Sequence, residues 1–176
     1  MIDIAVIIPT LKLTDLLDQC LTSLSKTTLN GTFEVSVSLN SEAPPEFKNW
    51  GKKYSWVKWH VLGKNLGFAK GNNVGFEAAT GDYVMLLNND TVIAPGAIFA
   101  MVRHLQHDSN VGVVGPLTNN IGNEAKLFVE YEDMEQMKTV ARQVTTGYRG
   151  VATPIPVVAY FAAMFRRADL EKFGLL

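Results

Sequence analysis

The sequence has one cysteine, almost no net charge and no long hydrophobic run. Cys20 cannot form an internal disulfide, and zinc sites built from several cysteines are excluded. Sixteen Lys and Arg residues against seventeen Asp and Glu residues leave a formal charge of −1, so no broad basic surface for nucleic acid is expected. The longest apolar run, from Val157 to Phe165, is far shorter than the roughly 20 residues of a membrane-spanning helix.

Targeting signals and glycine-rich nucleotide motifs are missing as well. Asp3 stands where a secretory signal carries positive charge, and the first apolar run, Ile4–Ile8, is too short for one. We therefore expect a cytoplasmic protein, free or peripheral at the inner membrane face, with no transmembrane segment. The turn after this run has no glycine, which argues against a dinucleotide-dependent oxidoreductase, and the sequence contains no P-loop.

The sequence does contain apolar strands that alternate with helical patterns through residue 115. Uninterrupted apolar runs are typical of strands covered on both faces, and apolar residues three and four apart are typical of helices. We expect strands at 4–8, 33–39, 56–62, 83–87, 111–114 and 157–165. We expect helices at 13–24, 70–79, 95–107, 133–145 and 168–173, with an extended turn at 44–45 and an irregular stretch at 117–131. The alternation predicts one α/β domain over residues 1–176, with a mostly parallel sheet flanked by helices.

Three of the predicted strands end in polar residues. Ligands of such sheets bind beyond the carboxyl ends of the strands, so Pro9-Thr10-Leu11, Asn40-Ser41 and Asn88-Asn89-Asp90 are the segments of interest. Asp90 is a lone carboxylate directly after a buried strand. Mg²⁺ or Mn²⁺ prefers carboxylate, water and phosphate oxygens, and one protein carboxylate is enough if a diphosphate supplies the rest. The same residues also occur in ordinary strand-ending turns, so this pattern alone leaves both readings open.

The full set of motifs resembles the family 2 glycosyltransferases, which have the Rossmann-like GT-A fold of three α/β/α layers. The matching pieces are VIIPT (6–10), NLGFAKGNN (65–73), GDYVMLLNND (81–90) and APGAI (94–98). VGVVGP (111–116) and the tail FRRADLEKFGLL (165–176) are also similar to later family segments. The likeness covers nearly the whole chain and is weakest over 117–156. Among family members, the sequence is similar to bacterial enzymes that build surface polysaccharides, including rhamnosyltransferase-like proteins.

The resemblance implies a transfer reaction, metal-dependent and inverting, from a UDP- or dTDP-sugar to a glycan or lipid-linked acceptor. It also implies a donor nucleotide-binding set: Pro9, Thr10, Leu11, Asn40, Asn65, Gly67, Phe68, Gly71, Asn73, Asn88 and Asn89. The first three would lie beside the base, and Asn88 would take the first position of an Asp-x-Asp-like motif near the ribose. Asp90 would bind Mn²⁺ or Mg²⁺.

The chain departs from the family pattern at three places. Asn88 replaces a common Asp, so weak metal binding without nucleotide is expected. The second strand ends in VSLNSEAPPE (37–46) instead of an Asp-rich turn, which leaves the donor base open. The chain ends at Leu176, before the region where family members carry the catalytic base. We therefore expect a domain truncated on its acceptor side, with the base beyond Leu176, and a catalytically incomplete module that only binds nucleotide or a partner is the alternative.

Four other groups of residues are candidates for a functional or a structural role. Arg166 and Arg167 could contact phosphate or form ordinary salt bridges. His104 and His107 share a helix face and could bind a metal or lie exposed, and His60 is expected to be structural. The tryptophans Trp50, Trp56 and Trp59 could stack on a ligand or pack. Glu130, Glu132 and Asp133 are expected to form a solvated loop.

Overall fold

The computed structural model of the chain describes residues 2–27 and 31–176 and contains a six-stranded sheet. Its strands are β1 (Ile4–Thr10), β2 (Phe33–Leu39), β3 (Val57–Val61), β4 (Tyr83–Leu87), β5 (Val113–Val114) and β6 (Ala162–Arg166). They lie in the order β3-β2-β1-β4-β6-β5. The first four strands pair in parallel, whereas β6 runs antiparallel to both β4 and β5. The predicted mostly parallel sheet is therefore confirmed.

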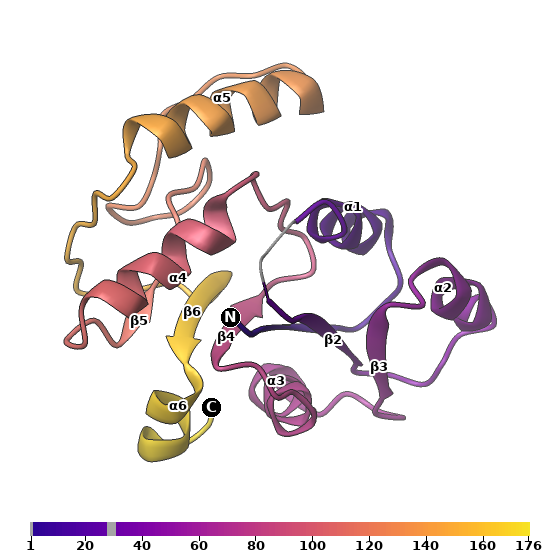
Figure 1. Cartoon of the computed structure of the whole chain (residues 1–176). Coiled ribbons are helices and arrows are strands. Elements are labelled where there is room, and N and C mark those ends of the chain that lie inside the picture. The colour runs from indigo at the N-terminus through magenta and orange to yellow at the C-terminus, as the bar shows by residue number, and fades with distance from the viewer. Residues whose placement is uncertain (1, 28–30) are drawn as a thin grey trace.

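Helices cover both faces of this sheet, so the fold has the predicted three layers (Figure 1). The helices are α1 (Asp15–Leu24), α2 (Phe47–Lys53), α3 (Gly67–Ala78), α4 (Ala97–His107), α5 (Met134–Gly147) and α6 (Arg167–Phe173). In the view of Figure 1, α1 and α4 lie above the sheet, and α3 and α6 lie below it. Helix α5 lies farther out, beyond α4, and contributes no fully buried residue.

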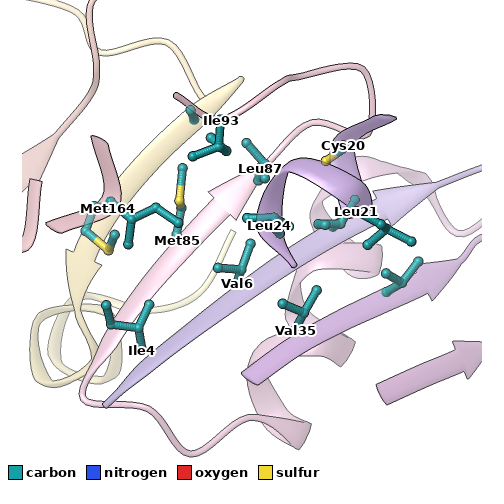
Figure 2. Packing of buried hydrophobic residues seen from close by; sticks show 14 of the residues in the cluster. Ile4, Val6, Cys20, Leu21, Leu24, Val35, Met85, Leu87, Ile93 and Met164 are labelled. Carbon is teal, nitrogen blue, oxygen red and sulfur yellow. The ribbon is translucent and has the colours of Figure 1, made fainter. Parts of the chain in front are cut away.

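Strand β1 forms the centre of the core, because Ile4 through Ile8 are all completely buried. Its alternate residues supply the two faces: Ile4, Val6 and Ile8 belong to the cluster with α1 and α4, and Ile7 belongs to the cluster with α3. Figure 2 shows the larger cluster, in which Cys20 and its α1 neighbours point toward the sheet. A continuous apolar run is therefore required here, since both faces of the strand are covered.

Two expected strands were too long, and one helix was not predicted. The last strand begins only at Ala162, so residues 157–161 are not in a strand, and β5 comprises only Val113–Val114. Helix α2 follows Pro44-Pro45, where only an extended turn was predicted. This helix has seven residues and no fully buried side chain, so it carries no clear apolar periodicity.

At the edge of the sheet opposite the carboxyl ends, the carboxylate of Glu34 connects β2 to β3 and to the segment before β4. Glu34 on β2 accepts hydrogen bonds from the backbone N–H groups of Thr80 and Gly81, which lead into β4, and forms an ion pair with Lys58 on β3. Burial alone would raise the pKa of Glu34, but the hydrogen bonds from these three partners outweigh it and lower the pKa. Glu34 therefore stabilises the fold in its ionised form.

We predict that Glu34→Gln lowers the free energy of unfolding by about 2 kcal/mol near neutral pH, because hydrogen bonds to a charged group are lost. Since folding lowers the pKa of Glu34, its contribution is present above the unfolded value and is lost as the pH falls through the folded value. Urea denaturation of both proteins at about pH 7 and about pH 3 measures this. The exposed Glu77→Gln is the control, and a difference that persists at the lower pH would contradict the prediction.

Candidate functional site at the carboxyl edge of the sheet

The ends of β1, β2 and β4 are joined directly by hydrogen bonds. The side-chain amide of Asn89 donates to Thr10 Oγ1 over 2.8 Å, and the Thr10 hydroxyl donates to the carbonyl of Lys12 over 2.8 Å. The backbone N–H of Asn40 donates to the carbonyl of Thr10 over 2.7 Å. The structure therefore brings together the three polar strand ends that the sequence singled out.

Asn40 connects this edge to the loop that precedes α3. Its side-chain oxygen accepts from the N–H of Leu66 over 2.9 Å, and its side-chain nitrogen donates to the carbonyl of Gly67 over 2.8 Å. The residue is buried, and these bonds use both ends of its amide. Asn40 therefore fixes the loop that presents Asn65 and Phe68, a positioning role that the predicted nucleotide contact did not include.

Glycines let α3 start at this edge and lie close to the sheet. Gly67 has φ +84°, a left-handed conformation that favours glycine, and the side chain of Asn65 accepts its N–H in a tight turn. A β-carbon at Gly71 would lie 3.0 Å from Asn40 Nδ2. A β-carbon at Gly75 would lie 2.5 Å from the side chain of Ile7, closer than such atoms can approach. Helix α3 therefore depends on glycine for its contact with β1.

Asp90 is exposed just past β4, and helix α1 forms hydrogen bonds to the loop that carries it. The Cys20 thiol donates weakly to the carbonyl of Asn88 over 3.8 Å, and Ser23 Oγ accepts the N–H of Ile93 over 3.0 Å. Burial raises the pKa of Cys20 to about 12, and the negative charge of nearby Asp90 adds to the shift. Cys20 therefore stays a neutral thiol, and the exposed Asp90 is the side chain at this rim that could hold a cation.

Other predicted nucleotide-binding residues differ in their exposure and contacts. Leu11 and Phe68 expose 51% and 45% of their surface, so two apolar side chains face solvent where the base was expected. Asn65 is also exposed. Asn73 is different, because its amide donates to the carbonyl of Leu176 over 2.8 Å and so reaches toward the last residues of the chain.

The two arginines have the structural role, not the phosphate role. Arg166 donates to the carbonyls of Val111 and Asp108 over 2.8 and 2.7 Å and pairs with Asp169. Arg167 donates to the carbonyl of Gly81 over 2.8 Å. Both lie toward the opposite edge of the sheet, because Arg166 pairs with the first residue of β4.

Most of the tryptophans and histidines also have no ligand-binding arrangement in the described part of the chain. Trp50 and Trp59 pack edge to face with ring centroids 6.3 Å apart, whereas Trp56 is 39% exposed. Over residues 2–27 and 31–176, no group of three His, Cys, Asp or Glu side chains could hold a metal, so His104 and His107 lack further ligands. The acidic cluster is exposed, and Asp133 caps α5 by accepting the N–H of Gln136 over 2.8 Å.

A family model described as "Glycosyl transferase family 2" matches residues 5–174, nearly the whole chain. The chain belongs to this family. The resemblance drawn from the strand-end motifs is therefore confirmed. Comparison with curated protein sequences gives no match.

Two solved structures share the fold of this family 2 chain. The mannosyltransferase PcManGT from Pyrobaculum calidifontis, solved with GDP-Man and Mn²⁺, superposes with a TM-score of 0.67 at 19% identity, over 99% of this chain and 47% of its own. S. aureus TarS 1-349 gives a TM-score of 0.67 at 18% identity, over 97% of this chain and 49% of its own. The chain therefore spans about half the length of these structures. No helix in the described part of the chain is long and apolar enough to cross a bilayer.

We predict that Asn40→Ala lowers the free energy of unfolding by about 2 kcal/mol, because the hydrogen bonds to the partly buried backbone groups of Leu66 and Gly67 are lost. It should also abolish any nucleotide binding that depends on the loop around Phe68. Urea denaturation and calorimetric titration with nucleotide measure the two effects. Asn49→Ala, on the exposed surface of α2, is the matched control and should change neither. If the Asn40 variant were as stable as the wild type, the hydrogen bonds from Asn40 to the loop would be dispensable.

Proposed function

We propose that the chain is the donor-binding domain of a metal-dependent glycosyltransferase that uses a nucleoside diphosphate sugar. The hydrogen-bonded edge formed by Thr10, Asn40 and Asn89, with the exposed Asp90 beside it, carries this proposal. Ligands of parallel α/β sheets bind at this edge. Membership of family 2 and the mannosyltransferase solved with GDP-Man and Mn²⁺ support it.

The residues present fit a divalent cation only when a diphosphate is also bound. Asp90 supplies one exposed carboxylate, and its neighbours Asn88 and Asn89 supply only neutral amides. One carboxylate together with phosphate oxygens is the usual protein environment of Mg²⁺. When bound, Mn²⁺ or Mg²⁺ would offset the negative charge that grows on the leaving nucleoside diphosphate. Asp90 would hold that cation, and Asn88 would bond the ribose.

The base would lie between the end of β1 and the start of α3. Leu11 and Phe68 expose apolar surface there, and Asn65 adds amide donors and acceptors. No acidic side chain follows β2 directly, because Asn40 and Ser41 stand there. UDP and dTDP remain our proposed donors, and the neighbouring mannosyltransferase makes GDP a third candidate to be measured.

We further propose that the sugar is transferred with inversion to a glycan or lipid-linked acceptor. This reaction would belong to polysaccharide biosynthesis in the cytoplasm. The buried, unpaired Cys20 supports a reducing compartment. An inverting transfer needs a carboxylate that accepts the proton of the acceptor hydroxyl. We assign this role to no residue of the chain, so donor binding and transfer are tested separately.

We predict that Asp90→Asn removes the Mn²⁺ dependence of nucleoside diphosphate binding, because the isosteric amide cannot anchor the cation. Calorimetric titrations of UDP, dTDP and GDP, each with and without Mn²⁺, measure this. Mn²⁺ should strengthen binding at least about tenfold in the wild type, equivalent to about 1.4 kcal/mol, and leave the variant unchanged. Asp82→Asn, which alters an exposed carboxylate just before β4 at the opposite edge, is the control. Equal Mn²⁺ dependence in wild type and Asp90→Asn would refute the proposal.

We predict that Phe68→Ala weakens binding of the preferred nucleotide about tenfold whether or not Mn²⁺ is present, because an aromatic surface near the base is lost. The same titrations measure it. Phe99→Ala is a matched control, since Phe99 is also a half-exposed phenylalanine in the first turn of a helix, α4. If both variants bind like the wild type, the base does not contact Phe68.

Turnover separates the enzyme from the module that only binds. Release of nucleoside diphosphate from a sugar donor, measured with and without candidate acceptors, should depend on Asp90 if the chain is active alone. Metal-dependent binding without any release would favour the catalytically incomplete module.

A further inference from the structure

A strip of polar side chains crosses the face of the sheet beneath α3. On β2, Val35 and Val37 belong to the core cluster with α1, so the alternate residues Ser36 and Ser38 face the other way. On β3, His60 is the register partner of Ser38 in a parallel pair, and register partners share a face. The three polar side chains therefore lie on the α3 face of neighbouring strands.

The strip contains buried polar atoms that lack partners. Ser36 and Ser38 are completely buried, and their hydroxyl oxygens have no hydrogen-bond partner among residues 2–27 and 31–176. The Nε2 atom of His60 is buried in the same way. A buried polar group left unpaired costs about 1–3 kcal/mol, so three of them on one face require an explanation.

The charges around His60 favour its neutral form. Lys58 lies on the same face of β3 and forms an ion pair with Glu34 on β2, and Lys64 and Lys70 are exposed in the preceding loop and in α3. Burial lowers the pKa of His60, and the positive charge of Lys58 lowers it further. A neutral imidazole has one donor and one acceptor nitrogen, so it can join a network with hydroxyl groups.

We propose that Ser36, Ser38 and His60 line a buried binding site for ordered water beneath the loop that leads into α3. Two hydroxyls and an imidazole offer both donors and acceptors without net charge, which suits water. A divalent cation is disfavoured because the nearby carboxylate, Glu34, is already engaged by Lys58 and two backbone N–H groups.

The site lies near the residue that holds the predicted nucleotide loop. Ser38 lies on β2, two residues before Asn40, which follows the strand and bonds Leu66 and Gly67. The pairing of β2 with β3 continues to the ends of both strands, since the N–H of Leu62 donates to the carbonyl of Leu39 over 2.9 Å. Bound water would therefore support the base of this loop, a role that goes beyond the proposed transferase function and does not require it.

A double-mutant cycle tests whether Ser38 and His60 share water. Ser38→Val and His60→Leu should each lower the stability to urea, and the double variant should lose less than the sum, because either change alone removes the shared water. His60→Gln should recover part of the loss, since its amide can bond water. Additive losses, a stabilising Ser38→Val, or equal effects of Gln and Leu would each overturn the proposal.

The pH dependence gives a second readout. Folding lowers the pKa of His60, so its contribution to stability is present above the unfolded value, about 6.5, and is lost as the pH falls through the folded value. The wild type should lose more stability between about pH 7.5 and about pH 5.5 than His60→Gln does. Equal losses would count against the site.

A crystal structure of the unmodified chain observes the site directly and does not depend on how the variants fold. Water within hydrogen-bond distance of Ser38 Oγ and His60 Nε2 is expected, and a dry site would overturn the proposal. None of these measurements uses a nucleotide. Failure of donor binding would leave this inference standing, and a dry site would leave the proposed function standing.

Discussion

The hydroxyl of Thr10 stands where three segments of the chain must meet, and the candidate site depends on it. Thr10 ends β1, which lies between β2 and β4 in the parallel part of the sheet and whose residues Ile4–Ile8 are completely buried. Because both neighbours are parallel to β1, their ends arrive at the same edge as its own. The side chain of Asn89 and the backbone of Asn40 then reach Thr10 directly. Burial of β1 is therefore the energetic basis of the polar edge.

The face beneath α3 is divided into an apolar and a polar half. Ile7, Val84 and Leu86 form an apolar cluster with Phe76 under one side of the helix. Under the other side, β2 and β3 carry serine, histidine and an ion pair. Gly75 brings α3 against Ile7, where side-chain packing holds it. The helix is thus anchored on its apolar side, and the loop before it is held by hydrogen bonds from Asn40.

The sequence predicted those features that depend on local pattern. The run Ile4–Ile8 could only be a doubly covered strand, and the polar strand ends pointed to one shared edge. The tether by Asn40 could not be foreseen, because its partners Leu66 and Gly67 are distant in sequence and are bonded through their backbones. The arginines were ambiguous for the same reason, since the carbonyls that accept from Arg166 come from α4 and the segment after it.

Under the proposed function, the electrostatics of the edge would couple the binding of the cation to that of the diphosphate. Asp90 is a single exposed carboxylate beside two amides on a chain whose net charge is −1, so water competes effectively for a free cation there. A nucleoside diphosphate would supply additional negative oxygens as ligands for a cation held by Asp90. Under the proposed function, the cation and the diphosphate would therefore bind together or weakly, and the protein would contribute chiefly the position of the complex. That position is fixed by the loop of Asp90, which rests on α1 through Cys20 and Ser23.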